Sequence, residues 1–377
     1  MTKQFLALSD FCTIIQGGRH GLSGNDFVSE GYPAYGAGGL NGFLDTYEFE
    51  HPAVILSSIG ARCGKCFYAS GRWSSLANTQ VIVPDENKAD PRFLWFQLND
   101  EGRWHRSGTG QPFIKPSDVK AHRVFLPPIE DQRRIAAILD QADALRTKRR
   151  EALALLDELQ RGIFVDMFGD PVANPKGWER VSFQSLLEEI EGGWSPNCLD
   201  RPAAHGEWGV LKLGAVTQCE YREAENKALP PDIEAVPALE VKPGDLLFSR
   251  KNTYDLVGAC ALVGSARPRL LIPDLIFRLR LREGAPIEKR FLHQLLVFPT
   301  KRKEIQKLAS GSSGSMPNIS KGRLSAASIE LPPLSLQQEF AKKLDAVAAQ
   351  KVACLDGLIA SNELVASLQH RAFRGEL

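Results

Sequence analysis

The chain contains the same pattern twice, and this repeat restricts its possible folds more than any other feature. Segment 126–132, Leu-Pro-Pro-Ile-Glu-Asp-Gln, recurs at 331–337 as Leu-Pro-Pro-Leu-Ser-Leu-Gln, 205 positions later. The same shift places Ile135 on Phe340, and weaker matches precede it in the same order, such as Arg-Phe-Leu at 92–94 and 290–292. The repeat predicts two related halves, each a globular domain followed by a helix.

Each copy of the pattern leads into a helix with an apolar stripe of about 3.5-residue period, typical of a coiled coil. In the first helix the predicted stripe is Ile135, Ile138, Ala142, Leu145, Ala152, Leu156, Leu159 and Ile163, with Arg149 interrupting it. In the second it is Phe340, Leu344, Val347, Lys351, Cys354, Leu358, Ser361, Val365, Leu368 and Ala372. We expect the stripes to pair in an antiparallel coiled coil with a pseudo-twofold axis; packing of each helix on its own domain is the alternative.

The register of the two helices stays open at this point. The shift between copies is 205 at Asp140 and Asp345 but 209 if Phe164 is matched to Phe373. The second helix is therefore expected to be longer before its matching phenylalanine.

The globular parts contain short β-strand patterns bounded by Gly and Pro, with short helices at 90–99 and 287–298. We predict a mixed α/β (α+β) fold of two strand-rich domains separated by the two long helices. The expected boundaries are 1–126 for the first domain, 127–170 for the first helix, 171–331 for the second domain and 332–377 for the second helix.

Composition argues against a disordered, a disulfide-stapled or a membrane-spanning chain. Hydrophobic residues make up 43% and the formal net charge is only +1, so the chain is expected to fold, and any nucleic-acid contact must come from local basic patches. Seven cysteines are an odd number in a chain of this size, which favours reduced thiols. No signal peptide or apolar run of about 18 residues is seen, so we expect a cytoplasmic protein.

Motifs for catalysis and metal binding are weak, and we predict no catalytic and no metal site. Cys63 and Cys66 have the spacing of half a zinc site without a second half. Asp232, Glu240 and Lys242 imitate the acidic pair and lysine of metal-dependent nucleases, but they lie where a turn and a surface loop are expected. No P-loop or nucleophile elbow occurs.

Basic, amide and aromatic side chains gather in the expected loops of both halves. Such side chains can neutralise phosphates, and Arg or Asn can read base edges. The candidate DNA-binding residues are Arg19, His20, Arg62, Lys65, Arg72, Arg103 and Arg106 in the first half, and Arg250, Lys251, Asn252, Tyr254, Arg267 and Lys321 in the second.

The chain resembles the specificity subunit of type I restriction-modification systems. The resemblance rests on segment 126–135, Leu-Pro-Pro-Ile-Glu-Asp-Gln-Arg-Arg-Ile, on the helix that follows to Phe164, and on the second copy from Leu331 to Phe373. Segments 108–114 and 314–320 are similar to the family's approach to these helices.

The resemblance implies two target recognition domains that read a bipartite sequence in double-stranded DNA, with the helices as a spacer. It implies two modification (methyltransferase) subunits and restriction (endonuclease and translocase) subunits as partners. S-adenosylmethionine, ATP and Mg²⁺ are then expected on those partners, with no cofactor in this chain. The alternatives are a metal-dependent nuclease using Asp232, Glu240 and Lys242, and a coiled-coil adaptor between protein-binding modules.

Overall fold

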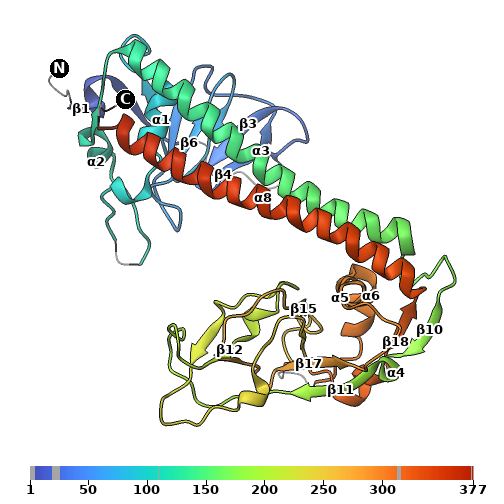
Figure 1. Ribbon diagram of the computed structural model, residues 1–377. Helices are drawn as coiled ribbons and strands as arrows, with labels where there is room; N and C mark the ends of the chain where they lie inside the picture. The colour runs from blue at the N-terminus through green and yellow to red at the C-terminus, as the bar shows by residue number, and fades with distance from the viewer. Residues whose placement is uncertain (1–4, 19–25, 109, 312–315, 375, 377) are drawn as a thin grey trace. The chain divides into compact units, whose positions relative to one another are not determined.

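The computed structural model describes residues 5–18, 26–108, 110–311, 316–374 and 376 (Figure 1). The chain divides into two compact units. Unit 1 consists of residues 1–152 and 354–377, and unit 2 of residues 153–353. Each long helix is therefore shared between the units, whereas the sequence-based boundaries treat both helices as separate segments.

Unit 1 is built on a four-stranded antiparallel sheet in the order β2 (Cys12–Gln16), β8 (Thr79–Pro84), β5 (Ala53–Ser57) and β6 (Cys66–Ala69). A second sheet has the order β4 (Gly39–Leu44), β3 (Tyr32–Gly36) and β7 (Ser74–Ser75). The pair β1 (Phe5–Ala7) and β9 (Arg123–Phe125) stands before α3, and α1 (Pro91–Leu98) and α2 (Pro116–Ala121) complete the unit. The central strand β5 is buried along its whole length, as its apolar run Ala-Val-Ile-Leu requires.

Unit 2 repeats this topology. Its four-stranded sheet has the order β11 (Leu187–Gly192), β17 (Ile276–Leu281), β14 (Leu246–Ser249) and β15 (Cys260–Leu262). The three-stranded sheet is β13 (Asn226–Ala228), β12 (Gly209–Leu211) and β16 (Leu270–Leu271), and the pair is β10 (Glu179–Ser182) with β18 (Ser328–Leu331). Its short helices are α4 (Phe183–Leu186), α5 (Lys289–Val297), α6 (Pro299–Gln306) and α7 (Lys321–Ser325). The predicted mixed, strand-rich fold class is confirmed.

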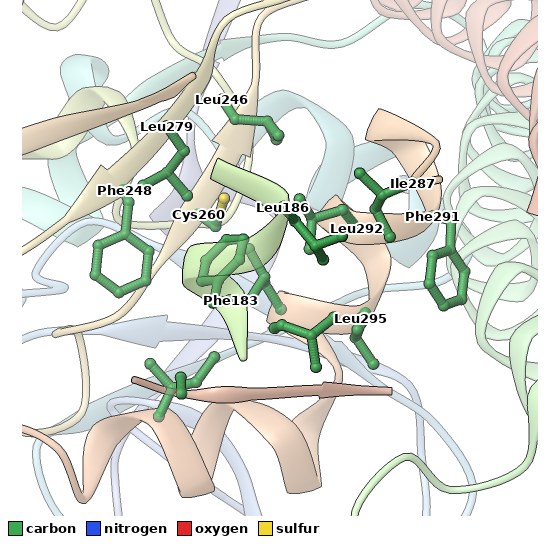
Figure 2. Close-up of a cluster of buried hydrophobic side chains, with 14 of the residues drawn as sticks. Phe183, Leu186, Leu246, Phe248, Cys260, Leu279, Ile287, Phe291, Leu292 and Leu295 are labelled. Carbon is green, nitrogen blue, oxygen red and sulfur yellow. The ribbon is translucent and has the colours of Figure 1, made fainter. Parts of the chain in front are cut away.

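The core of unit 2 lies between this sheet and α5. Figure 2 shows Phe248, Cys260 and Leu279 from the sheet facing Leu292 and Leu295 of α5, with Phe183 and Leu186 between them. Phe164 and Phe168 of the first long helix extend this core onto Phe291 and Phe340. The matching cluster of unit 1 joins Phe93 and Ile135 to Phe373 at the end of the second long helix.

The two long helices, α3 (Ile129–Phe168) and α8 (Leu334–Ala372), pair antiparallel within each unit (Figure 1). The buried or half-buried rows that face the partner helix alternate in steps of four and three residues. In α3 the row is Ile135, Leu139, Ala142, Arg146, Arg149, Leu153, Leu156, Gln160, Ile163 and Met167. In α8 it is Phe340, Leu344, Val347, Lys351, Cys354, Leu358, Ser361, Val365, Leu368 and Ala372.

The structure corrects the predicted stripe of α3 at four positions: Ile138, Leu145, Ala152 and Leu159. Of these, Ile138, Leu145 and Leu159 are 38%, 43% and 50% exposed. The row instead passes through Leu139, Arg146, Leu153 and Gln160, one residue further on in each case. Polar side chains are tolerated there because they have partners: Arg146 pairs with Asp143, and Lys351 Nζ donates to Gln160 Oε1 at 3.0 Å.

The register also differs from the expectation of a longer second helix. Every member of the α8 row lies 205 positions after its counterpart in α3, from Ile135 and Phe340 to Met167 and Ala372. The shift of 209 arose because Phe164, one turn before Phe168, was matched to Phe373. Both helices therefore present the same face along their whole length.

A buried glutamine fixes the start of each long helix. Gln132 Nε2 donates to the carbonyls of Lys88 and Pro127, and its Oε1 accepts from the amide of Asp90. Gln337 makes the same three bonds to Pro286, Pro332 and Glu288. The glutamine that repeats in the sequence thus makes the same hydrogen bonds in both units. They join α3 to the segment before α1, and α8 to the segment before α5.

Candidate nucleic-acid interface

The two units share a backbone frame at the end of the central strand. In unit 2, the amide of Arg250 donates to Leu275 O at 3.1 Å, and Arg250 O accepts from the amide of Ile319 at 2.8 Å. Asn252 N donates to Pro317 O at 3.3 Å. We call residues 250–252 and 317–319 the strand-end frame of unit 2.

Unit 1 has the same frame. Ser58 N donates to Asn78 O and Ser58 O accepts from Ile114 N, both at 2.9 Å, while Gly60 N donates to Pro112 O at 3.0 Å. Residues 58–60 and 112–114 are therefore the strand-end frame of unit 1. The backbone is conserved between the units, but the side chains on it are Ser-Ile-Gly in one and Arg-Lys-Asn in the other.

The frame of unit 2 carries a group of positive charges. The Arg250 guanidinium lies 4.9 Å from the ring centre of Phe277, and its Nε donates to Asn318 Oδ1 at 3.1 Å. Lys321, at the start of α7, lies with Nζ 6.0 Å from the same ring. Lys251 shares a β-bridge with Asn318. The frame and the start of α7 thus bring together Arg250, Lys251 and Lys321 of the predicted set.

Two acidic groups near β17 are already paired with a buried arginine. Arg278, next to Phe277 in β17, is 2% exposed and pairs with Glu191 at 2.7 Å and with Asp245 at 3.1 Å. Burial raises the pKa of Glu191, but the hydrogen bonds and charges of Arg278 and Arg280 outweigh it, so its pKa is lowered. The carboxylate stays ionised within its own ion pairs.

Several other predicted cations of unit 1 are held by acidic neighbours. Arg72 pairs with Glu50 at 2.7 Å and lies over the Tyr47 ring. Arg103 pairs with Asp100 at 3.1 Å, and Arg106 with Glu101 at 3.4 Å. All three arginines are exposed, and such surface pairs are weak enough to exchange for phosphate contacts.

The remaining predicted residues lie outside the strand-end frames, except Asn252, which belongs to the frame of unit 2. Arg62 Nη1 donates to Gly38 O, and Arg267 Nη1 donates to Ala204 O. Lys65 is half-buried in the loop between β5 and β6, Asn252 is buried and bonded within the frame, and Tyr254 is 62% exposed. Arg19 and His20 lie outside the described residues. Contact of any of these residues with DNA stays a prediction.

The structure also brings in two residues that sequence analysis missed. Phe277 and Asn318 hold the Arg250 side chain, but neither was among the candidate DNA-binding residues. Phe277 belongs to the apolar pattern of β17, and the pairing of Asn318 with Lys251 joins segments 67 positions apart.

Two residues of the nuclease alternative make local structural contacts, and the third, Asp232, is exposed in a turn. Glu240 Oε1 accepts from the amide of Arg269 at 2.6 Å, and the Lys242 amide donates to Asp245 Oδ2 at 2.9 Å in a turn. Cys63 and Cys66 are buried and donate to the carbonyls of Ser58 and Leu98, and burial raises the pKa of both thiols. Within the described ranges, no cluster of three or more His, Cys, Asp or Glu side chains is arranged to bind a metal ion.

No helix in the described part of the chain has the length and apolarity needed to span a membrane.

Solved structures have a similar fold. The specificity subunit of the type I restriction-modification system from M. genitalium superposes with a TM-score of 0.63 at 13% identity, over 99% of this chain and 96% of that chain. A structure described as the basis of complex assembly and conformational transition of the type I R-M system gives a TM-score of 0.55 at 19% identity, over 99% and 98%.

Curated relatives are similar in sequence. The EcoEI type I restriction enzyme specificity subunit of Escherichia coli is 36% identical over 168 residues, which are 44% of this chain and 28% of that protein. The EcoKI specificity subunit of Escherichia coli is 24% identical over 282 residues, 70% of this chain and 60% of the relative. The MjaVIII specificity subunit of Methanocaldococcus jannaschii is 25% identical over 324 residues, covering 78% and 72%. The matches thus span 28% and 60% of the two Escherichia coli relatives.

A family model described as the type I restriction modification DNA specificity domain matches residues 2–155 and 274–361. These ranges comprise more than half of the chain and include both strand-end frames except residues 250–252. The resemblance found in the repeated segments is therefore confirmed. The chain belongs to the family of type I restriction-modification DNA specificity subunits.

Proposed function

We propose that this chain recognises a bipartite target in double-stranded DNA, with one half-site read by each unit. The observation that carries the proposal is the repeated strand-end frame, which presents different side chains on the same backbone. Two readers with equal architecture but unequal surfaces bind two different short sequences. Linking both in one chain lets the second contact form at high effective concentration, so the pair binds more tightly than either unit alone.

The proposed partners are two modification (methyltransferase) subunits and restriction (endonuclease and translocase) subunits in the cytoplasm. S-adenosylmethionine, ATP and Mg²⁺ would bind to those partners, and this chain would carry out no bond-breaking step. The surface of the long helices supports a docking role. Ile138, Leu145 and Leu159 of α3 and Val352 and Ile359 of α8 are 38–58% exposed, an apolar content that favours contact with another protein.

The test is to co-express the chain with a type I modification subunit from the same genome and to map N6-methyladenine by single-molecule sequencing. A new motif with two specified parts and an unspecified gap is the expected result. The modification subunit alone is the control and should leave no such motif. A methylation pattern that does not change when this chain is added would contradict the proposal.

The test also separates the remaining alternatives. A nuclease would show Mg²⁺-dependent cleavage by the purified chain, lost in Glu240→Ala. An adaptor that does not bind nucleic acid would co-purify with partners but show no salt-dependent association with DNA.

A further inference from the structure

The Arg250 side chain is held in one orientation before any ligand binds. Its backbone amide donates to Leu275 O at 3.1 Å, and its carbonyl accepts from the amide of Ile319 at 2.8 Å. Its Nε donates to Asn318 Oδ1 at 3.1 Å, and its guanidinium lies 4.9 Å from the centre of the Phe277 ring. Phe277 itself is only 1% exposed, so the ring that the guanidinium packs on is fixed in the core.

The outer edge of this guanidinium remains available. Within the described part of the chain, its two Nη groups have no hydrogen-bond acceptor, and they do not belong to the buried polar atoms without a partner. Arg250 is half-buried, so part of its side chain is accessible to solvent. The two Nη groups carry four N–H donors in the plane of the guanidinium.

A planar fork of N–H donors matches two acceptors side by side. The O6 and N7 atoms of guanine in the major groove present this pattern, and an arginine is their commonest protein partner. We infer that Arg250 is a specificity-determining residue of unit 2 that reads one guanine of its half-site, an assignment that rests on the proposed function. Lys251 and Lys321 flank it and supply charge for neighbouring phosphates.

The equivalent place in unit 1 cannot perform this role. Ser58 occupies the position of Arg250, and Gln80 occupies the position of Phe277, because each pair lies on matching strands of the two sheets. Gln80 is 2% exposed and its Nε2 donates to Ile114 O at 2.9 Å. The cation and the ring that holds it are thus both absent from this position in unit 1. The guanine contact is confined to the half-site of unit 2.

The assignment is tested by selection from a randomised double-stranded DNA library with the full-length chain. Arg250→Lys keeps the charge but loses the planar fork, and Arg250→Gln loses both. We expect one guanine in one half of the selected motif to lose its preference by about 5- to 150-fold in both variants, with the other half unchanged. Arg282→Gln is the matched control, since Arg282 is an exposed arginine at the opposite end of β17.

Asn318→Ala provides a second, independent variant. It leaves Arg250 in place but removes the acceptor of Nε, so we expect a smaller loss of preference at the same guanine. Equal thermal unfolding of variants and unaltered chain shows that a change in motif does not come from misfolding.

Other outcomes overturn the assignment. One such outcome is that Arg250→Gln weakens the binding of all sequences alike and reduces the slope of log binding constant against log salt concentration by about one. In that case Arg250 contacts a phosphate. An unchanged motif in both variants removes Arg250 from recognition. If the unaltered chain selects no sequence at all, the proposed function fails, and the assignment fails with it.

Discussion

Gln132 and Gln337 are both fully buried and make the same three hydrogen bonds, although they lie 205 positions apart. Each glutamine satisfies an amide and two carbonyls that would otherwise lack partners in the core. We expect Gln132→Leu and Gln337→Leu each to lower the free energy of unfolding by at least about 3 kcal/mol, since three polar groups lose a partner and each costs about 1–3 kcal/mol. Chemical denaturation measures the loss. Gln141→Leu, an exposed position of α3, is the control and should change stability by less than about 0.5 kcal/mol.

Leu139 and Ile138 are neighbours in α3, but only Leu139 is in the buried row. Leu139 is fully buried and Ile138 is 38% exposed. Leu139→Ala should lower the free energy of unfolding by about 2–5 kcal/mol, because it removes buried apolar area and leaves a cavity. Ile138→Ala should lower it clearly less. Thermal unfolding of the two variants tests which residues face the partner helix. A larger loss for Ile138→Ala would contradict the observed row.

Lys301 and Glu330 form a buried ion pair in unit 2. The Nζ to Oε2 distance is 2.9 Å, and their side chains are 1% and 3% exposed. Lys301→Met removes the closer cation from the buried carboxylate of Glu330 and should lower the free energy of unfolding by about 3–5 kcal/mol. The double variant Lys301→Met with Glu330→Leu should recover most of this loss, because no buried charge remains. If the double variant is no more stable than Lys301→Met alone, the loss of stability comes from altered packing and not from an unpaired buried charge.

His293 makes the stability of unit 2 depend on pH. Burial lowers its pKa, although its Nε2 contacts the carbonyls of Cys219 and Cys260 at 3.2 and 3.1 Å. Between the lowered native pKa and the unfolded value of about 6.5, the unfolded state binds the proton and the native state does not. The free energy of unfolding therefore falls as pH drops below about 6.5.

Calorimetric scans between pH 7.5 and 5.5 measure this effect. His293→Gln should flatten the pH dependence, while the exposed His205→Gln of the same unit should leave it unchanged. Equal slopes for the unaltered chain and His293→Gln would show that another group titrates.

The repeat in the sequence was sufficient to predict two related strand-rich units and two long helices. In α8 the predicted stripe and the buried row consist of the same residues, because the polar members Lys351 and Ser361 continue the spacing. In α3 the stripe followed the apolar Ile138, Leu145 and Leu159 instead of Leu139, Arg146 and Gln160. A rule based on hydrophobicity alone selects such neighbours, since it takes no account of the polar partners, Asp143 for Arg146 and Lys351 for Gln160.

The candidate interface was predictable only as a set of residue types. Arg250, Lys251 and Lys321 were identified by charge, but their common frame depends on pairing between residues near 250 and residues near 318. Long-range pairing of this kind leaves no local periodicity. The role of Phe277 was hidden because an aromatic residue in a buried strand looks like ordinary core.

The division of each long helix between the units bears on the order in which the protein can fold during synthesis. Residues 153–353, which make up unit 2, are translated as one uninterrupted block, whereas unit 1 also needs residues 354–377. Roughly 200 residues pass through the ribosome in about 10–40 s at ~5–20 residues per second. Throughout this time Phe93 and Ile135 lack the cover that Ala372 and Phe373 later provide. The unit that begins first is therefore completed last, and its apolar cluster around Phe93 and Ile135 stays uncovered until residues 372 and 373 are made.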